Sequence, residues 1–210
     1  MSPELEDYIL SHIDPEPEEL RRLNRDVNVY LLYPRMCSGH LQGRILKMLT
    51  AMIAPERVLE LGTYAGYSAQ CMAEGMPAGG ELHTIELDDE LEDFIMERFR
   101  RSPHAEKLHL HIGDVMEIVP QLGGEWDMVF MDANKRHYPA YYDMLLPLVR
   151  KGGYILADNT LWDGKVTMPD TCHDPQTRGI MEFNDMVAAD PRVERVILPL
   201  RDGLTLIRKL

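Results

Sequence analysis

The stretch at residues 58–73 constrains the fold more than any other part of the chain. A short apolar run that contains Glu60 ends in two glycines, Gly62 and Gly66, and a helix-like segment follows at residues 67–73. Glycine accepts a positive φ and lets a ligand approach the backbone, and a helix start offers unpaired N–H groups at its positive end. The stretch therefore predicts a strand, a tight turn and a helix that can hold a ligand. The alternative is an ordinary strand–turn–helix with structural glycines.

The spacing of these glycines indicates the kind of ligand. The order is E-x-G-x-x-x-G, and Tyr64 stands where the dinucleotide fingerprint has the glycine that admits a pyrophosphate. A cofactor without phosphates fits this turn better. Glu86, twenty residues after Gly66, ends the next predicted strand, where a carboxylate can accept hydrogen bonds from ribose hydroxyls. The turn and this acid together suggest S-adenosylmethionine.

The length and charge of the chain limit the remaining possibilities. At 210 residues we expect one domain, residues 1–210, with a helical cap at 1–54 and an α/β core at 55–210. The net charge of −13 argues against a nucleic-acid partner. Cys37, Cys71 and Cys172 form no metal or disulfide pattern. Since no apolar run approaches the ~20 residues of a membrane span, we expect a cytoplasmic protein with no membrane partner.

The N-terminal cap is predicted to be helical. Helices are expected at residues 4–11, from residues 15–17 to residue 31, and at 41–53. The last of these has an apolar face at helical spacing, made of Leu41, Ile45, Leu46, Leu49 and Ile53. This cap is interpreted as a roof over a ligand site, as plain packing, or as a subunit interface.

Strands and helices alternate in the rest of the chain. Further strands are expected at residues 82–87, 107–112, 127–131, 154–157, 193–200 and 204–208, and further helices at 89–101, 138–149 and 174–189. This alternation is typical of a doubly wound, mostly parallel sheet, here of seven strands. The turn at residues 201–203 indicates a closing hairpin, which makes the last strand antiparallel.

Oxygen side chains gather where two of these strands end. Asp132 follows one strand, and Asp158 and Asn159 follow the next. Ligands of such sheets bind beyond the carboxyl ends of the strands, and hard oxygen ligands suit Mg²⁺, with Mn²⁺ or Ca²⁺ as alternatives. The other interpretation of each residue is a turn or a helix cap. Lys135 is either a solvated lysine or a general base beside the ion.

The histidines and aromatic residues carry weaker signals. No pair of histidines has the spacing H-x-x-x-H, and His109 and His111, which share one face of a predicted strand, are interpreted as structural. Trp162 and Tyr138 either sandwich a flat substrate or pack in the core.

Taken together, these motifs resemble a known family, the cation-dependent, S-adenosylmethionine-dependent O-methyltransferases, which includes catechol and caffeoyl-CoA O-methyltransferases. The resemblance runs from about Ser38 to the C-terminus and implies the Rossmann-like methyltransferase fold. The motifs that carry it are residues 60–68, 85–86, 130–135, 156–159 and 202–205.

The resemblance also implies roles for single residues. Those expected to bind the cofactor are Ser38, Glu60, Gly62, Thr63, Tyr64 and Ser68 at the methionine end, Glu86 at the ribose, Val115 at the adenine, and Asp132. Those expected to bind the metal are Asp132, Asp158 and Asn159, with Lys135 as the catalytic lysine and Asp163 as a substrate contact. Residues 162–175 would shape the acceptor pocket. The loop at residues 37–43 lacks the acidic residue that relatives usually carry before the glycine.

The predicted reaction is methyl transfer to a hydroxyl of a small catechol-like acceptor. Both oxygens of a vicinal diol can chelate one divalent ion, and Lys135 can take the proton. The alternatives are a nucleotide-binding oxidoreductase, a methyltransferase acting on nucleic acid or protein, and a non-catalytic S-adenosylmethionine-binding protein. A homodimer is expected, with the N-terminal helices at its interface.

Overall fold

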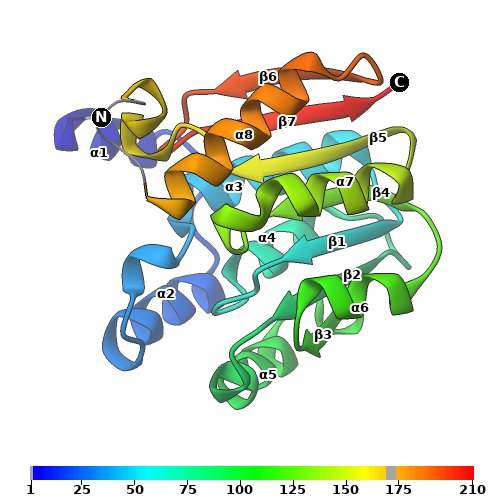
Figure 1. Ribbon diagram of the computed structural model, residues 1–210. Coiled ribbons are helices and arrows are strands. Elements are labelled where there is room, and N and C mark those ends of the chain that lie inside the picture. The colour runs from blue at the N-terminus through cyan, green and yellow to red at the C-terminus, as the bar shows by residue number, and fades with distance from the viewer. Residues whose placement is uncertain (1, 169–173) are drawn as a thin grey trace.

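A single mixed sheet, covered by helices on both faces, forms the centre of the molecule (Figure 1). The computed structural model describes residues 2–168 and 174–210. The sheet has the strand order β3-β2-β1-β4-β5-β7-β6. Helices α6, α7 and α8 lie on one face and α3, α4 and α5 on the other (Figure 1). The predicted doubly wound, seven-stranded sheet is therefore confirmed.

The strands divide into a parallel part and a closing hairpin. The parallel strands are β1 Arg57–Leu61, β2 Glu81–Glu86, β3 Leu108–Ile112, β4 Trp126–Met131 and β5 Val149–Asp158. The hairpin consists of β6 Val193–Leu198 and β7 Leu204–Lys209. Because β7 pairs antiparallel with both β5 and β6, the predicted antiparallel final strand is confirmed.

The helices fill the connections between the strands. Their bounds are α1 Pro3–Ser11, α2 Glu18–Tyr30, α3 Gly39–Ile53, α4 Tyr67–Gly75, α5 Glu92–Arg101, α6 Val115–Leu122, α7 Tyr138–Leu148 and α8 Pro175–Ala189. Short 3₁₀ turns are η1 Pro34–Met36, η2 Asp89–Leu91, η3 Ala105–Lys107, η4 Lys135–His137 and η5 Trp162–Thr167. In the part of the chain that the structure describes, no helix is both long and apolar enough to cross a bilayer.

The central strands bring three strand ends to one edge of the sheet. Strand β4 is buried over residues 128–131, as expected for a strand covered on both faces. Its last residue, Met131, pairs with Leu61 of β1 and with Ala157 of β5. The residues that follow these three positions therefore meet at the same edge.

Two elements differ from the sequence prediction. Helix α6 was not predicted, because Pro120 stands inside a helix of only eight residues and Pro removes an internal hydrogen bond. Its apolar positions nevertheless follow helical spacing. Strand β5 begins at Val149, five residues earlier than predicted, because Gly152 and Gly153 lie within the strand although they resemble a turn.

The buried face of α3 also differs from the prediction. Of the five predicted apolar positions only Leu46 is fully buried, and the other fully buried residues are Gln42, Gly43 and Thr50. A Cβ added at Gly43 would lie 2.7 Å from Cys71 Sγ, so glycine permits the close approach of α3 to α4. The helix therefore turns a small and polar face inward, and the reason for the buried polar residues lies in the site described next.

Candidate active site

A cavity of about 510 Å³ opens at the carboxyl edge of the sheet. This volume is sufficient for a small-molecule ligand. The predicted site residues that line the cavity are Gly62, Tyr64, Glu86, Val115, Asp132, Lys135, Asp158 and Asn159. The fold thus brings eight of the predicted residues, from four different strand ends and the helix α6, to one space.

The glycine turn after β1 forms one wall of this cavity. Gly62 has a φ of +94°, and a Cβ at this position would lie 2.7 Å from the carbonyl oxygen of Asp132. Only glycine fits both the backbone angle and the space. The backbone N–H of Tyr64 donates to Glu86 Oε2 at 2.7 Å, and the N–H of Asp88 donates to Glu86 Oε1 at 3.0 Å. The turn therefore fixes the acid that was predicted to bind ribose.

A buried polar cluster supports the turn from behind. Glu60 is fully buried, and its carboxyl group accepts hydrogen bonds from the hydroxyls of Ser68 and Thr84. The hydroxyl of Thr63 is hydrogen-bonded to that of Thr84. Burial raises the pKa of Glu60 to about 8. Glu60, Thr63 and Ser68 do not line the cavity, so the structure places them as supports of the turn and not at the cavity wall.

The two predicted metal-binding aspartates lie side by side. Asp132 and Asp158 directly follow the paired residues Met131 and Ala157 of adjacent parallel strands, which are about 4.8 Å apart. Asp158 is only 5% exposed, and its carboxylate accepts hydrogen bonds from Gln42 Nε2 at 2.5 Å and from the N–H of Asn159 at 2.8 Å. Burial, and then the negative charge of Asp132, raise the pKa of Asp158 to about 6.

These contacts define an oxygen-rich site that fits a divalent ion. Two neighbouring carboxylates repel each other, which is the second cause of the raised pKa of Asp158, and a cation between them would relieve that repulsion. Asn159 adds a side-chain amide oxygen at the same edge of the sheet, and its backbone φ is +59°. The donor set is that of a hard cation.

Lys135 supplies a positive charge at the same place. Its Nζ lies 2.6 Å from Asp132 Oδ1 and 3.3 Å from the carbonyl oxygen of Asp132. Lys135 is the first residue of the turn η4 and lines the cavity, and its side chain is 15% exposed. The amine is therefore within reach of a ligand bound at Asp132.

The two aromatic residues singled out in the sequence have different surroundings. Tyr138 is fully buried and does not line the cavity, and its hydroxyl lies 2.9 Å from the carbonyl oxygen of Met131 and 3.1 Å from that of Asp158. It joins the ends of β4 and β5, so the packing interpretation is the correct one. Trp162 does line the cavity, and its Nε1 is buried without a hydrogen-bond partner among the described residues.

Comparison with known proteins places this site in a family. Residues 11–210 match the sequence family described as O-methyltransferase. The chain belongs to this O-methyltransferase family. The predicted resemblance and the predicted S-adenosylmethionine-dependent O-methyltransferase class are thereby confirmed, and the oxidoreductase and non-catalytic alternatives are set aside.

Individual relatives of this O-methyltransferase cover almost the whole chain. Tricin synthase 2 of Oryza sativa is 33% identical over 221 residues, which is all of this chain and 76% of that protein. Caffeoyl-CoA O-methyltransferase 1 of Zea mays is 33% identical over 224 residues, all of this chain and 86% of that protein. The crystal structure of the O-methyltransferase TomG of Streptomyces achromogenes, in complex with SAM, has a TM-score of 0.91 at 30% identity and covers 98% of this chain and 96% of its own.

Two further predicted residues of this O-methyltransferase lie away from the cavity wall. Ser38 does not line the cavity, and its carbonyl oxygen accepts a hydrogen bond of 2.7 Å from Arg201 Nη1. Asp163 is exposed, has a φ of +52° and does not line the cavity either. Of the acceptor segment 162–175, residues 169–173 lie outside the described residues, as does Cys172 among them.

Several residues of the site were not found from the sequence. Gln42 bonds the buried Asp158, and Arg201 Nη1 donates to Gln42 Oε1 at 2.6 Å. A polar residue on an amphipathic helix looks solvent-exposed, so no sequence signal marked Gln42. The further lining residues that were not predicted are Arg35, Met36, Ile85, Leu87, Asp114, Ala133, Asn134, Tyr141, Gln176, Arg201 and Asp202, and Trp162 was left undecided.

Proposed function

We propose that this O-methyltransferase methylates one hydroxyl of a small aromatic vicinal diol, and that a divalent cation assists it. The observation that carries the proposal is the position of Asp132, Asp158 and Lys135 on one cavity together with the glycine turn. This one cavity therefore has a wall suited to the cofactor, a wall suited to a divalent ion, and the side-chain amine of Lys135.

The cofactor wall consists of the glycine turn, Glu86 and Val115, which all line the cavity. Glu86, held by the N–H of Tyr64, would accept hydrogen bonds from ribose hydroxyls. Gly62 would let the cofactor approach the backbone, and Val115 would lie beside the adenine. S-adenosylmethionine supplies the methyl group when bound. The SAM complex of TomG and the SAH complex of the Bacillus cereus O-methyltransferase, which is 26% identical to this chain with a TM-score of 0.89, support this assignment.

The ion-binding wall would hold Mg²⁺ through Asp132, Asp158 and Asn159, with Mn²⁺ or Ca²⁺ as alternatives. A divalent cation, when bound, favours the ionised form of a hydroxyl that coordinates it. Gln42 and the N–H of Asn159 orient the Asp158 carboxylate, and such supporting hydrogen bonds position metal ligands. Asp132 would exchange its present partner, Lys135 Nζ, for the ion.

Lys135 then has the role of proton acceptor. Its Nζ, once released from Asp132, would take the hydroxyl proton of the acceptor as a neutral amine. A positioned general base contributes roughly 10²–10⁴-fold to a rate. The acceptor ring would lie against Trp162 and Tyr141, which line the same cavity. Two buried atoms without a hydrogen-bond partner among the described residues, Trp162 Nε1 and Asn134 Oδ1, offer a donor and an acceptor to it.

A paired acceptor screen tests this proposal. We expect vicinal-diol aromatics to be methylated in the presence of S-adenosylmethionine and Mg²⁺, while matched monohydroxy aromatics react far more slowly. Excess EDTA should abolish turnover, and added Mg²⁺ should restore it. Undiminished turnover in EDTA would contradict the cation dependence, and equal rates with monohydroxy compounds would contradict the diol.

We also propose that two copies of the chain associate through the N-terminal helices. Large apolar side chains are exposed at the end of α2 and in the segment after it, where Tyr30 is 70% and Leu32 is 88% exposed. Exposed apolar side chains of this size often mark a protein interface. We expect light scattering to give the mass of a dimer and Leu32→Asp to weaken it. A monomer at micromolar concentration would contradict this.

A further inference from the structure

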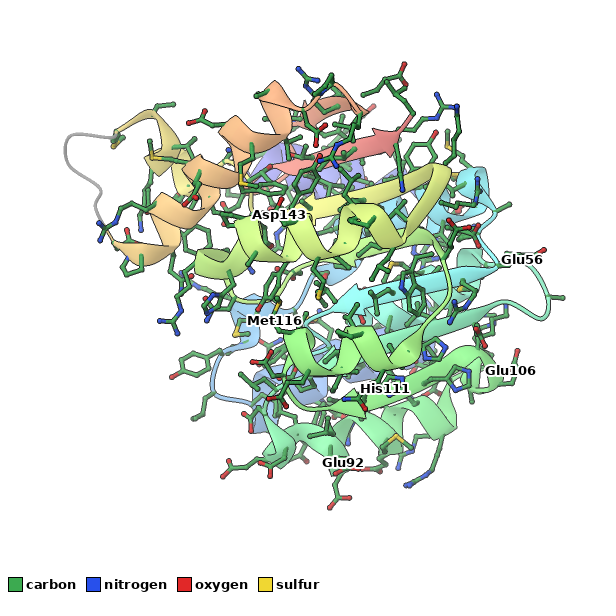
Figure 2. The ribbon with its side chains drawn as sticks, turned by 45° about the vertical axis from the view of Figure 1, so that its right-hand side comes forward. Glu56, Glu92, Glu106, His111, Met116 and Asp143 are labelled. Atoms are coloured by element: carbon green, nitrogen blue, oxygen red, sulfur yellow. The ribbon has the colours of Figure 1, made fainter. Side chains whose placement is uncertain are left out.

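Three histidines from two neighbouring strands form a cluster whose members do not line the cavity. Strands β2 and β3 pair His83 with His109 and Ile85 with His111. Because alternate residues of a strand share a face, Glu81, His83, His109 and His111 all lie on the same side of the sheet. The ring centroids of His109 and His111 lie 4.9 Å and 5.2 Å from that of His83. Figure 2 labels His111, which comes from β3, an edge strand of the sheet.

One nitrogen in this cluster lacks a partner. His83 Nδ1 is hydrogen-bonded to His111 Nε2 at 2.9 Å. The other nitrogen, His83 Nε2, is buried without a hydrogen-bond partner among the described residues, and the nearest carboxylate oxygen, Glu81 Oε1, is 3.6 Å away. This separation is too long for a hydrogen bond. When the proton of the His83 ring is on Nδ1, the lone pair of His83 Nε2 and a lone pair of Glu81 Oε1 therefore face each other.

The separation suits a metal ion between these two atoms. Metal–nitrogen and metal–oxygen bonds of zinc are about 2.0–2.2 Å, so two ligands at a tetrahedral angle are about 3.4 Å apart. His109 completes the set, because Glu81, His83 and His109 each offer one ligand atom within 4.8 Å of the others. We propose that Glu81, His83 and His109 form a Zn²⁺ site that is separate from the catalytic crevice.

The surrounding contacts support this site. The hydrogen bond to His111 fixes the ring of His83, as such bonds do for metal-binding histidines. Arg57 Nε donates to Glu81 Oε1 at 2.7 Å and holds the carboxylate in place, while its charge competes with the ion.

The two sites differ in place and in chemistry. None of the three proposed ligands lines the catalytic cavity, and His83 precedes Ile85, the first cavity-lining residue of β2, by two residues, or about 7 Å along the strand. Imidazole nitrogen selects zinc-like ions, whereas the oxygens of Asp132, Asp158 and Asn159 select Mg²⁺. An ion here would tie the edge strand β3 to β2. The zinc site would therefore take no part in the proposed reaction.

Metal titration of the full chain, freed of metal by chelation, tests the site. We expect calorimetry to show Zn²⁺ binding and the spectrum of Co²⁺ to change on binding. His109→Ala should weaken Zn²⁺ binding at least ~10-fold, and it should remove the rise in melting temperature that Zn²⁺ gives the parent chain. This variant is chosen because His109 is exposed, so its removal should not disturb the fold.

Two control variants make the result decisive. His12→Ala removes an exposed histidine of the N-terminal segment, and it should bind Zn²⁺ like the parent chain. Asp158→Ala removes a ligand of the oxygen crevice, and it should retain the Zn²⁺ site. The proposal is overturned if His109→Ala and His12→Ala bind Zn²⁺ equally well, or if Asp158→Ala alone abolishes Zn²⁺ binding.

Discussion

Gln42 of α3 donates a hydrogen bond of 2.5 Å to the buried carboxylate of Asp158, which is 116 residues away in the sequence. The side-chain oxygen of Gln42, Oε1, accepts a hydrogen bond of 2.6 Å from Arg201 Nη1. The side-chain amide of Gln42 is therefore held in one orientation, because only its NH₂ group can donate to the carboxylate of Asp158 and only its oxygen can accept from the guanidinium of Arg201. This bridge explains why α3 turns a polar residue toward the sheet.

We predict that Gln42→Leu lowers methyl transfer and moves its pH profile to higher pH. The substitution leaves a buried carboxylate oxygen without its donor, which costs roughly 1–3 kcal/mol, and the loss of a bond to the charged form raises the pKa of Asp158 further. Activity profiles between pH 5 and 9 check the shift. Gln121→Leu is the control, because Gln121 is exposed on α6. An unchanged pH profile for Gln42→Leu would show that Gln42 does not support the Asp158 carboxylate.

The raised pKa of Asp158 predicts a pH dependence of stability. The folded pKa of about 6 lies above its ordinary value of 3.8. The folded chain therefore binds this proton more tightly than the unfolded chain, and the stabilisation is present below pH ~4 and is lost as the pH rises to ~6. The difference between the folded and the unfolded pKa corresponds to roughly 2–3 kcal/mol in the free energy of unfolding.

Urea unfolding in EDTA at pH 4.5 to 7.5 measures this effect as a difference between two chains. Histidines titrate in the same range, so the comparison is between the parent chain and Asp158→Asn. We expect the loss of stability with rising pH to be smaller in Asp158→Asn. Mg²⁺ should stabilise the parent chain most above pH 6. Parallel curves for the two chains would contradict the assignment.

Lys135→Met should reduce turnover with little effect on the cofactor. Because Nζ is proposed to take the hydroxyl proton, we expect kcat to fall by roughly 10²–10⁴-fold, while the affinity for S-adenosylhomocysteine stays close to that of the parent chain. Steady-state kinetics and calorimetry measure the two quantities. Lys151→Met changes an exposed lysine on β5 and should leave both unchanged. A parent-like kcat in Lys135→Met would refute the role.

Gly62→Ala should destabilise the fold and weaken cofactor binding. The φ of +94° disfavours any residue with a Cβ, and the added atom would lie 2.7 Å from the backbone oxygen of Asp132. Gly79 has a similar φ of +80° with nothing within 4 Å of an added Cβ, so Gly79→Ala measures the backbone cost alone, ~1–2 kcal/mol. Unfolding free energies should show a clearly larger loss for Gly62→Ala. Equal losses would mean that the close contact has no effect.

Much of this protein could be predicted from local sequence because local rules govern those parts. The glycine turn requires a positive φ at Gly62, and alternating strands and helices produce parallel strands whose carboxyl ends share one edge. Asp132, Lys135, Asp158 and Asn159 therefore had to meet once the strands paired. Helix α6 was missed for a local reason too, since Pro120 contradicts its apolar spacing.

What only the tertiary structure decided are contacts between residues far apart in the chain. Gln42 looks like a surface residue until α3 is packed beneath Asp158 and Arg201, and Glu60, Thr63 and Ser68 could be placed behind the turn only after β2 supplied Thr84. The register of β2 and β3 likewise brought His83 to His109. The physical reason is the same in each case: burial and hydrogen bonding depend on partners that local spacing does not specify, whereas backbone angles and strand order depend on the neighbouring residues.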